Sequence, residues 1–461
     1  MPMIDLNPVL RRFAERTPLP VMARAVLERC LNPVQLDAWF AQVAEAQYTR
    51  TLLFSTVFEL MIQVVLRQHP SVHAAYRARV GERAVSVTSV YNKLTAVEVK
   101  TSGELVRYAA GQAQGLIEEL HGARAPLLPG VRVKVLDGTC LEGREHRLKE
   151  TRSSTAAPLP GKALAVFDPA LELITDLYPC EDAYTQERAL LGPVVEQAQA
   201  GQLWVADRNF CTQGFLTGLS ERQAWVLVRE HEQLRFTPQG AMRLIGRTED
   251  ATVSEQAVHL GPASQTQGLC LRRIEVRLDR PTRHGEDRLY LLTTLPEELA
   301  SALTLARLYR QRWTLERAFL HLTTELRCEV DTLAYPPAAL FALACAVVAF
   351  NVLGVVKAAL RAAHGPQAVE QVSGYYLAIE WGNVAESLEA VLDAQDWAVF
   401  QAVPIATLAA WLYTQAQRAD LRRYRKSTRG PKKTPPQRVN DPKRNHVSVA
   451  RLLAKRKKGA P

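Results

Sequence analysis

Cysteine is scarce in this sequence, and its arrangement excludes a disulfide-stabilised scaffold. Seven of the 461 residues are Cys, and no two of them form a C-x-x-C pair. An odd number of scattered thiols is typical of a reducing compartment. The ten His show no zinc-ligand spacing. The first residues, MPMIDLNPVLRRF, lack the charged segment and apolar run of an export signal, so we expect a cytoplasmic protein.

Motifs for two common enzyme chemistries are also missing. The sequence contains neither a P-loop nor a G-x-S-x-G elbow. We therefore expect no nucleotide cofactor and no acyl-enzyme intermediate. The composition, with 47% hydrophobic and 23% charged residues, is that of an ordinary globular protein. The length suggests two to four structural units, and no internal repeat is present.

Acidic residues are rare at one end of the chain. Residues 418–461 contain 16 Lys and Arg but two acids, a net charge of +14, so the other 417 residues carry −4 of the total of +10. A merely solvated end could also be basic. Cations interspersed with Pro, Gly and Ser at this density favour a polyanion partner, namely nucleic acid. We expect residues 418–461 to form a basic, flexible tail.

Long apolar runs are few, and the run at 337–360 needs a separate interpretation. It is close to the length of a membrane span. Asn351 interrupts it, however, and helices of ordinary polarity flank it. We predict a buried core helix, with a membrane-spanning protein as the alternative. Recovery of the protein without detergent would exclude that alternative.

The N-terminal part of the chain has helical periodicity. Residues 51–69 are apolar at helical spacing, and residues 103–122 predict a second helix that ends on Gly122. Two Pro in the segment 123–130 mark a boundary. We expect a helical domain over residues 1–125 that helps to bind DNA ends.

From residue 130 onward, strands alternate with helices, which is typical of an α/β layer architecture. Strands are predicted in VRVKVLDGT, ending at a D-G turn, in the hairpin formed by ALAVFD and LELITDLYP, and in LWVAD and AWVLVRE. Helices are expected over 185–201, with a bend near Gly192-Pro193, and over 213–223, 298–327 and 374–394. Residues 231–297 contain short β-like runs and predict a β-rich insertion.

Two carboxylates follow predicted strands directly: Asp137 in VLDGT and Asp207 in VADRNF. In open α/β sheets, the crevice beyond the carboxyl ends of strands is where chemistry assembles. One such Asp would be an ordinary turn or helix-cap residue. A third acid in the right place favours a site.

That third acid is Glu316, in the predicted helix YRQRWTLERAFLHLTTEL. At helical spacing, Tyr309, Arg312, Glu316 and Thr323 share a stripe beside the core-facing Leu residues. They are expected to point into a cleft at the margin of the core. Three converging carboxylates repel one another unless a cation neutralises them. Oxygen-only ligands suit Mg²⁺ or Mn²⁺, and two such ions can support an in-line phosphoryl displacement.

The order DGT, A-D-R-x-F and Y-x2-R-x3-E resembles the bacterial insertion-sequence transposases of the fourth insertion-sequence family. The resemblance extends over nearly the whole chain, from VYNKL at 91–95 to GYYLAIEWG and HVSVARLL. It implies a ribonuclease-H-like DDE catalytic core with the β-rich insertion, over residues 130–335. A helical domain precedes the core, and C-terminal helices over 336–417 and the basic tail follow it.

The resemblance also implies roles for individual residues. Asp137, Asp207 and Glu316 match the acidic triad that holds two Mg²⁺ ions, for which Mn²⁺ is expected to substitute. Tyr309 and Arg312 match residues that contact DNA phosphates beside the cleavage point. Arg208 and Arg229 lie where similar proteins often carry Arg near DNA, although both could be ordinary surface residues.

The sequence departs from the family pattern in three places. Thr323 stands where the signature has Lys, and His321 or Arg317 is a candidate substitute. Asn209 replaces the usual Gly of D-R-G-F and is expected in the left-handed region. Some relatives flip a base onto a Trp in the insertion, but residues 230–300 contain no Trp and have Phe236 and Tyr290 as their aromatics.

The expected function is therefore DNA transposition. The protein would bind the inverted repeats of its element, cleave the ends, and join the 3′-hydroxyls to target DNA, acting as a homodimer in the synaptic complex. Two alternatives remain open: a catalytically impaired DNA-binding relic or inhibitor of transposition, and a stand-alone nuclease of the same fold.

Overall fold

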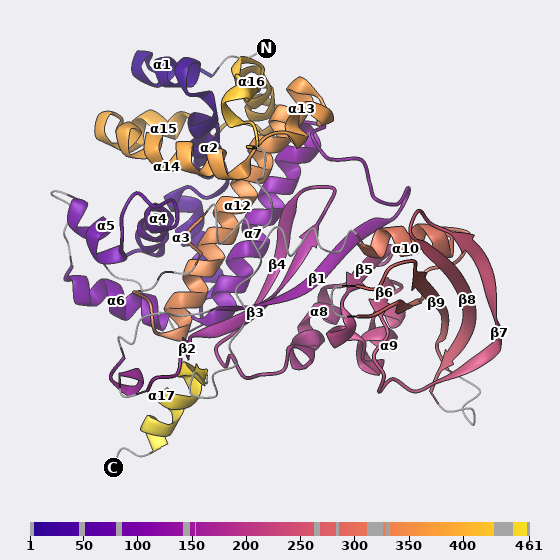
Figure 1. The fold of residues 1–461 in the computed structure, drawn as a ribbon. Coiled ribbons are helices and arrows are strands. Elements are labelled where there is room, and N and C mark those ends of the chain that lie inside the picture. The colour runs from indigo at the N-terminus through magenta and orange to yellow at the C-terminus, as the bar shows by residue number, and fades with distance from the viewer. Residues whose placement is uncertain are drawn as a thin grey trace.

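A mixed β-sheet of nine strands runs through the middle of the protein, with helices on both of its faces (Figure 1). The structure is a computed structural model. It describes residues 4–45, 51–79, 85–141, 148–152, 154–261, 268–282, 285–310, 326–328, 330, 332–427 and 446–458. Over these residues the chain is a mixed α/β protein, as the sequence predicts.

The order of the strands across the sheet is β4-β3-β1-β5-β6-β10-β9-β8-β7. The strands are β1 (Arg132–Leu141), β3 (Gly161–Asp168), β4 (Leu173–Cys180), β5 (Gln202–Ala206), β6 (Trp225–Arg229), β7 (Phe236–Arg247), β8 (Ala251–Leu260), β9 (Cys270–Leu278) and β10 (Arg288–Thr293). Strands β1, β5 and β6 are parallel, and all other neighbours are antiparallel. The predicted hairpin is confirmed as β3 and β4.

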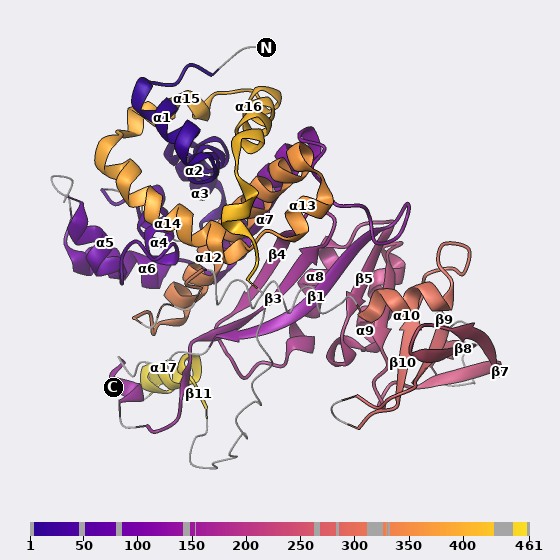
Figure 2. The same ribbon diagram turned by 45° about the horizontal axis from the view of Figure 1, so that its top comes forward.

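Helices from both ends of the chain cover one face of this sheet at the β4 edge. From the N-terminal part come α1 (Pro8–Arg16), α2 (Pro18–Cys30), α3 (Pro33–Val43), α4 (Phe54–Val65), α5 (Val72–Ala78), α6 (Val87–Ala96) and α7 (Val99–Glu119). From the C-terminal part come α12 (Pro336–His364), α13 (Pro366–Glu370), α14 (Gly374–Val391), α15 (Ala394–Gln401), α16 (Ile405–Arg418) and η4 (Leu421–Tyr424). The two sets share one hydrophobic core, and α7 lies against α12 (Figure 2).

Local sequence explains where several of these helices begin. Asn7 and Asn32 cap α1 and α3, accepting hydrogen bonds from Leu10 N at 2.7 Å and Gln35 N at 3.0 Å. Pro occupies the first turn of α1, α2, α3, α12 and α13, where its missing N–H costs nothing. Helix α7 ends at Glu119 rather than at Gly122, and the Gly122 N–H bonds to Ile117 O.

Helix α12 contains the long apolar run and packs against the β4 edge strand. By length and composition alone it could cross a membrane, but its most apolar 18-residue window is completely buried inside the protein. Asn351, which interrupts the run, is also buried. Its side chain donates to Ile174 O at 2.8 Å and accepts from Ile174 N at 2.9 Å. The polar residue thus satisfies the backbone of an edge strand, and the prediction of a core helix is confirmed.

Shorter elements cover the opposite face of the sheet around β5 and β6. They are η2 (Glu187–Leu190), α8 (Leu191–Gln197), η3 (Arg208–Phe210) and α9 (Gln213–Glu221). They enclose a second hydrophobic cluster that includes Leu136, Trp204 and Phe215. The predicted helix over 185–201 is wrong in its extent. Pro193 has no N–H for residue 189, so the α-helix begins at Leu191 and a 3₁₀ turn precedes it.

Strands β7–β10 are the predicted β-rich insertion. They form an arm that extends away from the helices in both views (Figures 1 and 2). Because β10 pairs with β6, the arm continues the central sheet rather than forming a separate one. Helix α10 (Ala302–Arg310) packs on it.

The C-terminal segment is partly folded against the rest of the protein. Strand β11 (Val447–Ser448) pairs with β2 (Pro158–Leu159), and α17 (Val449–Lys458) follows close to η1 (Lys149–Thr151) (Figure 1). Asp182 accepts from Ser448 Oγ at 2.7 Å and from Arg451 Nε at 2.8 Å. The expectation of a flexible tail is therefore wrong for residues 446–458, because specific polar contacts hold them.

Candidate active site

Asp137 lies within a strand and not after one. The sequence predicts a strand that ends at a D-G turn, whereas β1 continues to Leu141. The reason is the antiparallel partner β3, whose residues pair with β1 from Val135 to Leu141 and place Ala165 opposite Asp137. This pairing keeps the Asp-Gly segment extended. The Asp137 side chain is partly exposed.

Asp207 follows β5 directly, as predicted. Its Oδ1 accepts a hydrogen bond from the Asn209 N–H at 2.7 Å, so Asp207 caps the turn η3. Asn209 is absent from the residues with positive φ among those that the structure describes. The expectation of a left-handed Asn209 is therefore wrong. The turn needs no special backbone conformation at this position because the Asp207 cap closes it.

The sheet register brings the two aspartates to the same level. Strands β1 and β5 are parallel, and Val135 pairs with Val205. Asp137 comes two residues after Val135, and Asp207 comes two residues after Val205. The two aspartates therefore follow paired residues of neighbouring strands, whose backbones are about 4.8 Å apart in a sheet. Val135 and Val205 both belong to the core under α7 and α12. Alternation therefore assigns both aspartates to that face.

The third candidate acid, Glu316, lies outside the described residues, as do Arg312 and Thr323. Tyr309 is described and lies in the last turn of α10. It is 7% exposed and belongs to the same core as Val135. Helix α10 therefore lies on the face of the sheet that carries Asp137 and Asp207. Leu326, on the other side of the undescribed segment, belongs to this core as well.

Arg208 and Arg229 lie near Asp207 but in different environments. Arg208 follows Asp207 directly in η3 and is exposed. Arg229 is the last residue of β6, is half-buried, and forms an ion pair with Glu286. Arg208 is the more accessible cation for a phosphate. Arg229 would first have to exchange its carboxylate partner.

A carboxylate that the sequence analysis missed contacts the backbone next to Asp137 and the side chain of Asn209. Glu187 of η2 accepts a hydrogen bond from Asn209 Nδ2 at 2.6 Å. Its other oxygen, Oε1, lies so close to Gly138 that a Cβ on residue 138 would clash with it. In the sequence, Glu187 is one charge in a predicted helix, and no local pattern distinguishes it from a solvated side chain.

The ligand atoms of the two aspartates can be compared with those that a divalent cation prefers. Asp137 and Asp207 offer only oxygen atoms, which are the ligands that Mg²⁺ and Mn²⁺ prefer. Among the described residues, no group of three or more His, Cys, Asp or Glu could hold a metal ion. The two aspartates fit a hard cation in ligand type, and Glu316 is the candidate for the third ligand.

The aromatic residues of the β-arm already have a partner. The Arg273 guanidinium lies 4.1 Å from the Tyr290 ring centroid and 5.1 Å from that of Phe236. Its Nε also donates to Glu230 at 2.6 Å. This stack of cation and rings stabilises the base of the arm.

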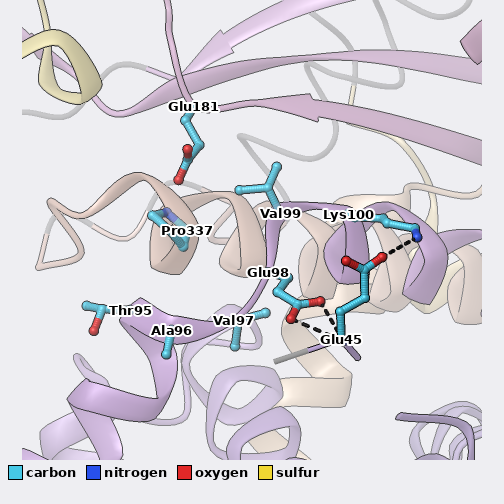
Figure 3. A pocket seen from close by; sticks show the side chains of 9 residues that line it. All are labelled: Glu45, Thr95, Ala96, Val97, Glu98, Val99, Lys100, Glu181 and Pro337. Carbon is cyan, nitrogen blue, oxygen red and sulfur yellow. Dashed lines mark hydrogen bonds and ion pairs between the residues drawn. The ribbon is translucent and has the colours of Figure 1, made fainter. Parts of the chain in front are cut away.

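A pocket elsewhere in the molecule has different chemistry. It has a volume of about 390 Å³ and lies at the junction of α6 and α7, beside the start of α12 (Figure 3). Three of its lining side chains are carboxylates, from Glu45, Glu98 and Glu181. Lys100 forms an ion pair with Glu45 at 2.9 Å, and Glu98 accepts from Glu45 N. This acidic lining disfavours a polyanion and contains neither Asp137 nor Asp207.

Comparison with known families gives an independent result. Residues 129–349 match the family model described as the transposase DDE domain. This region contains β1 through the first half of α12, and so includes both aspartates and Glu316. No match was found among curated proteins. The match supports a DDE transposase, a family that implies DNA as a partner and that generally uses divalent metal ions.

Proposed function

We propose that this protein is a DNA transposase of the fourth insertion-sequence family with a ribonuclease-H-like catalytic core. It binds the inverted repeats at the ends of its element, cleaves them, and joins the 3′-hydroxyls to target DNA in the cytoplasm. The observation that carries the proposal is the parallel register that sets Asp137 beside Asp207, inside the segment that matches the DDE domain. The strand order β4-β3-β1-β5-β6, with parallel β1, β5 and β6, supports this core.

Asp137, Asp207 and Glu316 are the residues that would hold two Mg²⁺ ions, with Mn²⁺ as a substitute. When bound, such ions supply a nucleophilic water or hydroxyl and stabilise the leaving oxygen. Glu316 is assigned from the sequence, and the described residues on either side of it in the chain, Tyr309 and Leu326, both belong to the core on the aspartate face. Thr323 at the signature Lys position removes one expected phosphate contact.

Four side chains are assigned to DNA. Tyr309 and Arg312 are assigned to the phosphates beside the cleavage point, and Arg208 and Arg229 to the flanking backbone. The basic C-terminal residues add salt-dependent attraction to phosphate. The N-terminal helices contribute to reading the ends, and a homodimer forms the synaptic complex.

The test is cleavage of a DNA fragment that carries the inverted repeat flanking the gene. The parent protein is incubated with and without Mg²⁺, beside the Glu316→Gln variant. Metal-dependent cutting at the edge of the repeat by the parent alone is the expected result. Tight binding without cutting by either protein would identify a relic or an inhibitor of transposition. Cutting with no preference for the repeat would identify a nuclease.

A further inference from the structure

Gly138, the residue after Asp137, is a glycine in the interior of a strand. Glycine weakens a strand and often marks a close approach by another group. Here the group is the Glu187 carboxylate: a Cβ on residue 138 would clash with Glu187 Oε1 and would lie 2.6 Å from its Cδ. Glu187 therefore occupies the space that a side chain at 138 would need.

The other oxygen of the same carboxylate connects to the second aspartate. Glu187 Oε2 accepts from Asn209 Nδ2 at 2.6 Å, and the Asn209 backbone N–H donates to Asp207 Oδ1 at 2.7 Å. A hydrogen bond to an ionised acceptor is about twice as strong as a neutral one. A single side chain thus contacts the backbone beside Asp137 and orients the turn that holds Asp207.

Glu187 makes these contacts from the opposite face of β1. Leu136 and Leu164 belong to the hydrophobic cluster under α8 and α9, and Gly138 pairs with Leu164. Gly138 therefore faces η2, whereas alternation assigns the Asp137 side chain to the other face. Glu187 therefore acts on the two aspartates through the backbone that carries them, and it is not a third carboxylate on their face of the sheet.

We propose that Glu187 is a positioning residue of the catalytic site, which fixes the spacing of Asp137 and Asp207 through Gly138 and Asn209. The proposal rests on the proposed function for its catalytic consequence. Asn209 then has a role that the usual Gly of the D-R-G-F pattern could not fill, because Gly has no side-chain amide for Glu187. Two residues that do not belong to the acidic triad, Glu187 and Asn209, thus complete the site.

The experiment compares four proteins: the parent, Glu187→Ala, Glu187→Gln and the control Glu196→Ala. Glu196 is an exposed residue of α8, near Glu187 but without its contacts to Gly138 or Asn209. Gln keeps an oxygen that can accept from Asn209 and removes the charge. Two quantities are measured: the rate of end cleavage as a function of Mg²⁺ concentration, and amide hydrogen exchange in peptides covering 132–141 and 203–211.

Glu187→Ala is expected to cleave about 10- to 100-fold more slowly and to need more Mg²⁺ for half-maximal rate, as for losses of residues that orient ligands. Amide exchange in both peptides is expected to accelerate. Glu187→Gln recovers most of the rate and the slow exchange, and Glu196→Ala behaves as the parent in both measurements.

Two results would overturn the proposal. Unchanged exchange in Glu187→Ala would show that the side chain does not hold these strands, whatever the cleavage rate. A Gln variant that cuts as slowly as the Ala variant, with exchange like the parent's, would show that Glu187 acts by its charge. If the parent itself does not cut DNA, the proposed function fails, and the exchange data alone then decide whether Glu187 positions the aspartates.

Discussion

Two regions of the central sheet differ in the contacts that hold them. At the β4 edge, under α7 and α12, the sheet is held by a large apolar core, beside which Asn351 is buried as well. Around Asp137 and Asp207, the chain is held by polar contacts from partly exposed side chains, namely Glu187 and Asn209. The difference teaches that stability and chemistry are assigned to separate parts of one sheet.

The largest expected effect is on cleavage. Asp137→Asn or Asp207→Asn should lower the rate of end cleavage by on the order of 10²-fold or more. The reason is that the charge on the leaving oxygen would lose the stabilisation of the metal ions that these carboxylates would hold. Binding to the repeat and the thermal midpoint should stay close to those of the parent, since both side chains are partly exposed. Gel-shift and calorimetric measurements check this. A large drop in the thermal midpoint would mean that the two aspartates are structural residues. It would contradict the assignment of stability and chemistry to separate parts of the sheet.

The next effect is on stability, at the β4 edge of the sheet. Asn351→Leu should lower the free energy of unfolding by about 2–5 kcal/mol, because the Ile174 N–H and C=O would lose their partners in a buried site. Urea unfolding measures this change. Asn92→Leu, at an exposed position on α6, is the matched control and should change little. Equal effects of the two substitutions would contradict the role of Asn351.

A smaller effect is expected where the C-terminal segment docks. Burial raises the pKa of Asp182, but the hydrogen bonds from Ser448 and Arg451 outweigh it and lower this pKa below its ordinary value. The stabilisation of docking is therefore complete above the ordinary pKa of an aspartate and is lost as the pH falls through the lowered one. Asp182→Asn should release residues 446–458 at neutral pH, with faster amide exchange there.

The docking prediction has a control in the DNA-binding data. Asp182→Asn retains every Lys and Arg of the tail, so the salt dependence of DNA binding should keep its slope. Removing residues 428–461 should flatten that slope, because these cations are assigned to phosphate. A slope that stays unchanged after the removal would show that residues 428–461 do not contact DNA.

The smallest expected effects distinguish the two arginines near Asp207. Arg208→Ala should reduce the salt slope of binding by about one, as for the loss of one phosphate contact. Arg229→Ala should reduce it less, because Glu286 already pairs with Arg229. Binding at several salt concentrations gives both values. The reverse order would mean that DNA displaces Glu286 and that Arg229 is the principal contact.

The elements that depend on near neighbours could be predicted from the sequence. They are the short apolar strands β5 and β6, the hairpin of β3 and β4, the β-rich arm and the apolar helix α12, and each follows from the local order of apolar and polar residues. The two aspartates could also be chosen from sequence. Asp207 follows its strand as predicted, whereas Glu316 and Arg312 remain predictions outside the described residues.

The features that join distant segments depend on the tertiary structure and could not be predicted from the sequence. Pairing with β3 keeps β1 extended through Asp137 and Gly138, although a D-G pair by itself predicts a turn. Docking of Ser448 and Arg451 on Asp182 orders part of a segment whose composition predicts flexibility. Glu187 meets Gly138 and Asn209 because η2 and η3 pack together at the end of β5. Each of these contacts joins residues that are far apart in the chain, and local periodicity carries no information about such pairs.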